Sequence, residues 1–225
     1  MYTESRKRSQ MVRKIKTNTL AEQAYVMLKN DIRHGVLVPG QRLAERLLTE
    51  SMAISRTPIR QALQRLEAEQ YLKRLPNGGY SVSQLRKEDI LHLYLIRIEL
   101  ETLAIEWAVK KCDEAGIREL KKMLAKMIHY GELGEMDKVA TYNSMFHRVI
   151  SSLSGSQMLV EIIDSLKNRI QNAILKGLMI QGAMEDSMRE HREIIEAMHR
   201  KETETAKRLI RVHLKRSMTV LLAHI

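Results

Sequence analysis

Three histidines and one asparagine in the C-terminal part of the sequence have the types and spacing that could bind a metal ion. Asn143 and His147 are four positions apart, which puts them one turn apart on the same face of a helix. His191 and His213 lie on either side of an expected turn near residue 201, so two antiparallel helices would bring both imidazoles to a similar height. Three neutral imidazoles and an amide oxygen suit a divalent cation such as Zn²⁺, Ni²⁺ or Mn²⁺. The alternative is that these are scattered helical histidines, partly buried and hydrogen-bonded, with no ion.

A second group of residues, around Pro58, suits contact with a polyanion. Ser55 or Thr57 can cap a helix N-terminus, and Pro58 fits the first turn, where a missing N–H costs nothing. Arg56, Thr57 and Arg60 then point outward from that turn, whose free N–H groups and dipole attract anions. Two arginines there suit phosphates and the guanine edges of a DNA major groove. The alternative is a surface helix with solvated arginines.

The segments on both sides of this helix predict a winged helix-turn-helix. A periodic stretch over residues 19–32 predicts a first helix, which Gly35 would end. A short amphipathic helix follows, and two short strands, 71–75 and 80–82, flank an Asn-Gly-Gly hairpin turn. The apolar positions are Leu43, Leu47, Leu48 and Met52 in the second helix, and Ile59, Leu63 and Leu66 in the third.

The distribution of charge favours DNA as the partner of this N-terminal part. The net charge is +11, and residues 1–87 hold 17 of the 38 Lys and Arg but only 7 of the 27 Asp and Glu. The remaining residues are almost neutral, so the excess lies where a polyanion would bind. Stacking on RNA bases is disfavoured because aromatic residues are only 4% of the chain. No apolar run reaches the length of a membrane span, which predicts no membrane partner.

Two further features bear on the cellular compartment. Cys112 is the one cysteine, which excludes an internal disulfide and fits the reducing cytoplasm. The basic N-terminus lacks a hydrophobic segment and does not read as a secretory signal. We therefore expect a cytoplasmic protein.

The chain after residue 88 predicts an all-helical bundle. It contains no proline, its glycines fall at breaks between segments, and apolar residues recur at spacings of three and four. We expect Trp107 and the methionines of these helices to fill the core. Six helices are expected, with a seventh allowed, so the fold class is mainly α. Their ranges are 88–110, 114–130, 136–152, 156–180, 183–200 and 202–223.

The N-terminal part resembles the DNA-binding domain of GntR-family transcriptional regulators. The resemblance rests on the run from Ser55 to Leu63, on Pro39-Gly40 and on Gly78-Gly79, in their mutual spacing. It implies that Arg56, Thr57 and Arg60 contact DNA from the recognition helix. Two positions depart from the family pattern: Ala53 and Gln70 stand where the family has glycine. The other residues assigned to the DNA-binding set are Arg46 on the preceding helix, Ser55, and the wing residues Gly78 and Gly79.

The C-terminal part is similar to the ligand-binding domain of the FadR-type branch of this family, called FCD. In that branch an Asp and three His hold a metal beside a pocket for a small carboxylate. The resemblance implies that His147, His191 and His213 are the histidine ligands. The Asp position, four before His147, is Asn143 here; an amide brings no negative charge, so ion binding should be weaker or favour another ion. Arg97 matches the pocket arginine and would bind the effector carboxylate, with a salt bridge to a nearby glutamate as the alternative.

These observations predict a cytoplasmic, homodimeric transcriptional regulator, in the repressor class, that binds a palindromic DNA operator and responds to a small carboxylate effector and a divalent metal. The expected parts are a basic tail (1–18), a winged helix-turn-helix domain (19–83) and an effector-binding and dimerisation domain (88–225). One rival is a metal-dependent hydrolase-like enzyme, since a three-histidine metal site with an open position can activate water. The other is a DNA-binding protein that needs no ligand.

Overall fold

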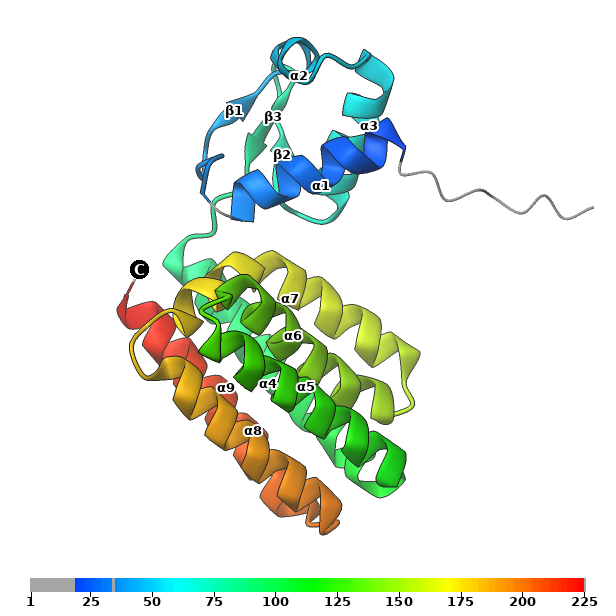
Figure 1. The fold of residues 1–225 in the computed structure, drawn as a ribbon, viewed down its shortest axis with the longest axis vertical. Helices are drawn as coiled ribbons and strands as arrows, with labels where there is room; N and C mark the ends of the chain where they lie inside the picture. Colours follow the sequence, from blue (N-terminus) through cyan, green and yellow to red (C-terminus); the bar gives the residue numbers. More distant parts are fainter. Residues whose placement is uncertain (1–18, 34, 225) are drawn as a thin grey trace, which may run out of the picture.

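The computed structural model describes residues 19–33 and 35–224. The predicted basic tail, residues 1–18, lies outside the described residues. Figure 1 shows a small N-terminal domain of helices and short strands next to a bundle of long helices. The chain passes from one to the other at the start of helix α4, close to residue 87.

The N-terminal domain is a winged helix-turn-helix with one more strand than the sequence predicted. Its Arg42–Leu43 segment forms a short strand, so Leu43 is not part of the second helix as we expected. It pairs antiparallel with the third strand, which gives a three-stranded sheet in the order β1-β3-β2. The elements are α1 (Leu20–Arg33), β1 (Arg42–Leu43), α2 (Glu45–Met52), α3 (Arg56–Ala68), β2 (Leu72–Arg74) and β3 (Tyr80–Val82).

The core of this domain lies under the apolar face of α3. Ile59, Leu63 and Leu66 are fully buried, as the periodicity predicted. Leu47 on α2 is 57% exposed, however, so its predicted place in the apolar face is wrong. Leu47 and Leu48 are neighbours on a helix and point about 100° apart. Leu48 takes the inward position and packs against the core.

The two positions that depart from the family pattern both have left-handed backbone conformations. Ala53, at the end of α2, has φ 53°, and Gln70, just after α3, has φ 64°. Both are conformations that glycine adopts at no steric cost and other residues adopt reluctantly. The turns therefore keep the geometry that the family's glycines would give, at some cost in stability.

The C-terminal domain is a bundle of six helices within the described residues, close to the predicted ranges. α4 packs against α6, α7 and α9, while α8 packs against α5 and α9. Trp107 is 38% exposed on α4, which corrects the expectation that it lies in the core. No helix of the described part is long and apolar enough to cross a membrane. The helices are α4 (Lys87–Lys111), α5 (Glu114–Glu132), α6 (Met136–Leu153), α7 (Gln157–Leu178), α8 (Ala183–His199) and α9 (Thr203–Ala223).

Candidate functional sites

The start of α3 presents free N–H groups and an arginine to solvent. Ser55 occupies the N-cap position with an extended backbone, but its side chain makes no capping hydrogen bond, contrary to expectation. Arg56 is the first residue of the helix, Pro58 lies in its first turn, and Arg56 and Thr57 are exposed. The first turn therefore keeps free N–H groups that could donate hydrogen bonds to a phosphate. Arg56 forms no ion pair with any described residue.

The other predicted DNA-contact arginines are held loosely. Arg60 pairs with Glu45 on α2 at 3.2 Å, and Arg46 pairs with Glu50 at 2.9 Å. Both arginine side chains are more than half exposed, and exposed ion pairs of this kind contribute little. Either guanidinium can therefore exchange its carboxylate for a phosphate or a base edge at small cost.

The tip of the wing has the backbone geometry that we expected from its glycines. Gly78 and Gly79 have φ of 85° and 77°, and a Cβ on Gly79 would lie 3.1 Å from the carbonyl oxygen of Leu43. β2 adds two exposed cations, Lys73 and Arg74, which the sequence reasoning did not assign to the site. Their position beside the wing could have been read from the strand prediction, since they lie just before the turn.

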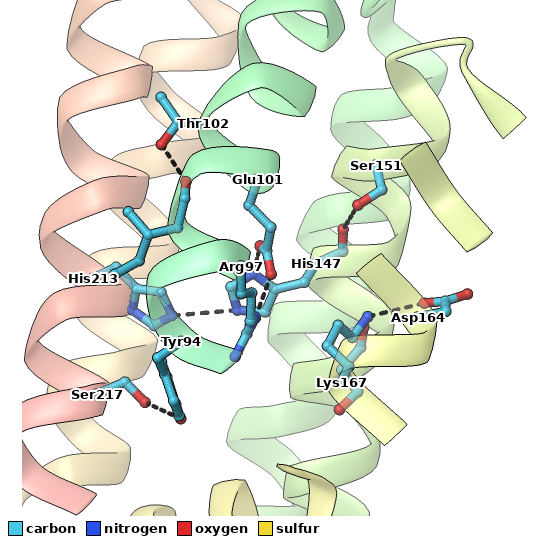
Figure 2. Close-up of polar contacts among 12 residues, drawn as sticks. Tyr94, Arg97, Glu101, Thr102, His147, Ser151, Asp164, Lys167, His213 and Ser217 are labelled. Carbon is cyan, nitrogen blue, oxygen red and sulfur yellow. Dashed lines mark hydrogen bonds and ion pairs between the residues drawn. The ribbon is translucent and has the colours of Figure 1, made fainter. Parts of the chain in front are cut away.

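The bundle brings the three predicted histidines together from three helices. His147 on α6, His191 on α8 and His213 on α9 are each 3% exposed or less. Nε2 of His213 lies 3.3 Å from Nε2 of His147 and 3.3 Å from Nε2 of His191. Figure 2 shows the rings of His147 and His213 pointing toward one another between α6 and α9. These residues are separated by up to 66 positions in the sequence, so the convergence is a product of the fold.

Carboxylates fix the orientation of two of the three rings. Oε2 of Glu101 lies 2.6 Å from Nδ1 of His147, and Oε2 of Glu190 lies 2.7 Å from Nδ1 of His213. A carboxylate only accepts, so each Nδ1 carries the proton and each Nε2 presents its lone pair. Two lone pairs thus face each other at 3.3 Å, an arrangement that a cation between them would stabilise.

The third ring, His191, is held by packing instead. It stacks on Phe146 with a centroid separation of 3.9 Å, and its buried Nδ1 has no hydrogen-bond partner among the described residues. Phe146 therefore positions the ring of His191 without determining which of its two nitrogens carries the proton.

The imidazoles are neutral in this setting. Burial lowers the pKa of His147 to about 3, because the attraction of Glu101 offsets only part of the cost of burying a cation. Burial also lowers the pKa of His191 and of His213. Burial alone would raise the pKa of Glu101, but Arg97 and His147 together hold it well below the ordinary range. Three uncharged nitrogen ligands are thus available around neutral pH.

Arg97 forms the salt bridge to a nearby glutamate that the sequence offered as one of its two roles. Its Nε donates to Oε1 of Glu101 at 2.5 Å, and its side chain is 2% exposed. The residue also lines the cavity beside His147 and His213. In Figure 2 the Arg97 side chain lies between those of Glu101 and Tyr94 on α4. The arginine is therefore anchored through one nitrogen while the rest of the fork stays available.

A small cavity joins these groups. Its volume is about 20 Å³, room for about one water molecule. Asn143 and Ser187 line it and are both buried, yet the side chain of neither forms a hydrogen bond with any residue that the structure describes. Arg216 also lines it and donates two hydrogen bonds to Glu190, from Nε at 2.5 Å and from Nη2 at 2.8 Å. The cavity thus contains cations, neutral ligands and unused polar groups.

The donor set and its spacing fit a divalent ion. An ion held tetrahedrally at about 2.0–2.1 Å from imidazole nitrogens separates those nitrogens by about 3.4 Å. Two of the three separations, from His213 to His147 and from His213 to His191, are 3.3 Å and match that spacing, and all three ligand atoms lie within 4.8 Å of one another. Asn143, one turn before His147, lines the same cavity and stands where a fourth ligand was predicted.

The sequence reasoning missed several residues of this site. Glu101 is one of the nearby glutamates that could pair with Arg97, but the sequence indicates no further role for it and none for Glu190, Ser187 or Arg216. Helical spacing held part of the signal, since Arg216 follows His213 by three positions and Glu190 precedes His191 directly. Helical spacing does not indicate which nitrogen of each histidine would form a hydrogen bond with a carboxylate.

Both parts of the chain match known protein families. Residues 20–82 match the bacterial regulatory proteins of the gntR family, and residues 92–216 match the FCD domain. The chain belongs to the GntR family. This GntR-family protein is a DNA-binding transcriptional regulator, and its relatives are regulators and not enzymes.

Individual relatives extend over most of this regulator. It is 32% identical to YdhC of Bacillus subtilis, an uncharacterised HTH-type transcriptional regulator, over 85% of this chain and 86% of YdhC. It is 28% identical to the gluconate operon transcriptional repressor of Bacillus subtilis, over 74% of this chain and 68% of that protein. The solved structure of Escherichia coli McbR/YncC has a TM-score of 0.74 and 25% identity, covering 90% of this chain and 97% of the other.

Proposed function

We propose that this regulator is a repressor whose affinity for its operator changes when a small carboxylate binds in the cavity of the bundle. The observation that carries the proposal is that two neutral, buried imidazoles, His147 and His213, line one cavity with Arg97, while the third, His191, contacts His213 beside it. A buried set of cationic and metal-binding groups has no purpose in packing alone and suits an anionic ligand. The gluconate operon repressor, one of several relatives named as repressors, supports the assignment of this regulator as a repressor.

The metal part of the proposal assigns His147, His191 and His213 as ligands of a divalent ion, Zn²⁺, Ni²⁺ or Mn²⁺, with Asn143 as a weak fourth ligand. Support comes from the two facing Nε2 lone pairs and from their separation. When bound, such an ion offers open positions to a carboxylate. Glu101 and Glu190 act as positioning residues that hold two of the rings.

The effector part assigns Arg97 and Ser187 as contacts of the acid. Arg97 keeps donors free beyond its hydrogen bond to Glu101, and Ser187 offers a hydroxyl with no other partner among the described residues. Because the cavity has room for only about one water molecule, the connection between α7 and α8 must widen to admit even a small acid. Gly177 and Ala183, at the two ends of that connection, already line the cavity.

The route from effector to DNA runs along α4. Arg97 and Glu101 lie on this helix, and its first residue, Lys87, follows the strand and linker that leave the winged helix. A ligand that tightens the cavity therefore acts on the helix that carries the DNA-binding domain. A coupling of about 1–3 kcal/mol changes operator affinity about 5- to 150-fold.

We also propose that the regulator is a homodimer on a palindromic operator, joined through α4 and α7. Ile96 and Trp107 are exposed apolar side chains on α4, about three helical turns apart. Met158 and Ile162 are exposed apolar side chains on the neighbouring helix α7. The buried contact between the two helices, at Ala104 and its neighbours, makes these one surface. The near-neutral bundle would not repel a second copy, and two half-sites give a small domain useful affinity.

The DNA-binding residues are tested by substitution at the start of α3. Arg56→Ala and Arg60→Ala should each weaken binding to a duplex enriched from a random-sequence pool, by about 1–3 kcal/mol for a lost bidentate base contact. Fluorescence anisotropy at fixed salt measures the change. Arg118→Ala, an exposed arginine on α5, is the matched control and should bind as the parent does. Parental affinity in both α3 variants would show that the helix does not read DNA in this way.

A further inference from the structure

We infer that the divalent ion and the acid occupy this cavity as an interdependent pair, because Asn143 leaves no negative charge facing the ion. The inference rests on the proposed effector site and concerns how that site is regulated. A regulator built in this way responds when both partners are present and only weakly to either one alone.

Every carboxylate around the histidines is already engaged on the outer side of the cluster. Glu101 lies between Arg97 and Nδ1 of His147. Glu190 lies between Arg216 and Nδ1 of His213. Each acid is thus balanced by one guanidinium, and together they leave the site without net charge.

The third acid near the cluster adds nothing. Asp164 on α7 pairs with the buried Lys167 at 3.3 Å and with Arg148 at 3.2 Å. Figure 2 shows this pair on the far side of His147 from His213. The net charge of Asp164, Lys167 and Arg148 together is therefore positive, so this group cannot compensate a cation in the cavity.

The inner side of the cluster offers only neutral ligands. His147, His213 and the amide of Asn143 line the cavity, and Nε2 of His191 lies 3.3 Å from that of His213. Asn143 is 5% exposed, and its side chain has no hydrogen-bond partner among the described residues. A divalent ion bound there would carry two uncompensated charges in a site that water barely enters. Buried charges without a counter-charge are strongly disfavoured.

A carboxylate that enters the cavity supplies the missing charge. It would lie between the ion and Arg97, so its own charge is compensated in turn. Since binding free energies are linked, the ion must strengthen acid binding by the same factor as the acid strengthens ion binding. An acid with a second oxygen next to its carboxylate, such as a 2-hydroxy acid, could also reach Ser187 or a second position on the ion.

The experiment is calorimetric titration of the full chain, stripped with chelator, with Zn²⁺ and with Mn²⁺. Each titration is repeated with saturating acetate or glycolate, two small acids that sequester free ions weakly. In the parent protein, the acid should tighten ion binding at least about tenfold, with glycolate more effective than acetate. The reverse titration, of acid into ion-loaded and ion-free protein, should give the same factor.

The variant Asn143→Asp separates charge from shape. It is isosteric and restores a carboxylate to the inner side of the cluster, so it should bind the ion tightly without acid. The factor by which acid strengthens ion binding should fall several-fold. Asn168→Asp, at an exposed position of α7 outside the cavity, adds the same charge elsewhere and should behave as the parent.

Four results would overturn the inference. Tight ion binding to the parent that does not depend on acid would show that the amide is no handicap. Equal ion affinity in the parent and in Asn143→Asp would show that charge at this position does not matter. Acid that binds equally with and without ion would refute the interdependence while leaving the effector site standing, whereas acid that binds in neither state refutes both.

Discussion

At the scale of single residues, the histidine cluster is held neutral by burial and held in orientation by two glutamates. Glu101 and Glu190 each accept a hydrogen bond from Nδ1 of one imidazole, so that Nε2 of that ring faces the centre of the histidine cluster. Each glutamate also takes an arginine, so no acid is left with an uncompensated charge. The cluster is thereby prepared for a cation even though its histidines resist protonation.

This neutrality has a consequence for the metal-free protein in mild acid. The pKa of an unfolded histidine is about 6.5, and the pKa of His147 in the fold is lowered to about 3. Between these values the unfolded chain binds a proton that the folded chain refuses. The contribution of such a histidine to the free energy of unfolding is therefore fully present above about pH 6.5. It is lost as the pH falls, by about 1.4 kcal/mol per pH unit for each such histidine.

Urea unfolding of chelator-treated protein, measured between about pH 6.5 and pH 5, checks this slope. The variant His147→Gln should reduce the slope by about one histidine's share, whereas His129→Gln at an exposed position of α5 should not. A free energy of unfolding that stays constant over this interval would mean that the buried imidazoles take up protons in the fold.

The candidate site could be predicted from the sequence only where residue type carries the signal. His147, His191 and His213 stand out as metal-binding types on helices, and the fold brings them together. The partners that complete the site are ordinary glutamates and serines, which occur on every helix surface. Glu101 is distinguished by being 1% exposed opposite His147, and that depends on how α4 packs on α6.

At the scale of elements, the helices α2, α3 and α8 each end next to a residue other than glycine with a left-handed backbone, and the last two invite comparison. After α3, the N–H of Tyr71 donates to the carbonyl of Leu66 and that of Gln70 to Glu67, a Schellman motif with a left-handed residue at Gln70. After α8, Lys201 occupies the equivalent place with φ 60°. Glycine is the residue that suits both places.

Replacing Gln70 with glycine should stabilise the winged helix by about 1 kcal/mol, because the left-handed strain exceeds the entropy that glycine loses. Amide hydrogen exchange over α3 should slow about fivefold, since the change acts on the local unfolding of this domain.

Lys201→Gly provides the contrast. It relieves the same backbone strain but removes the Lys201 ammonium, which donates to the carbonyls of Val109 and Cys112. Its net gain should therefore be smaller or reversed. Faster exchange over α3 in Gln70→Gly would contradict the assignment of strain.

The elements themselves were mostly predictable. The six helices of the bundle follow from apolar spacing and from glycines at their ends, which are local signals. β1 was missed because two residues are too few for any pattern, and its pairing with β3 is a long-range contact. Trp107 was misplaced because an apolar side chain on an exposed helix stripe has the same local pattern as one in a core.

At the scale of the whole molecule, the apolar surface shared by α4 and α7 predicts the oligomeric state. Ile162→Glu places a charge in this surface and should convert a dimer into a monomer in sedimentation experiments. Val212→Glu is the control, because Val212 is similarly exposed on α9, outside that surface. A parent that sediments as a monomer, or an Ile162→Glu variant that stays dimeric, would place the interface elsewhere or remove it.

The most direct test of the account is the operator affinity of the parent with and without ion and acid. With the duplex selected by the parent and with Zn²⁺ and glycolate at concentrations where calorimetry shows binding, anisotropy should report a change in affinity of at least about fivefold. Arg97→Lys keeps the charge but loses the guanidinium fork, so the response should shrink while affinity without ligand stays near that of the parent. Operator affinity that is unchanged in the parent, although ion and acid are both bound, would contradict the central claim that this cavity controls DNA binding.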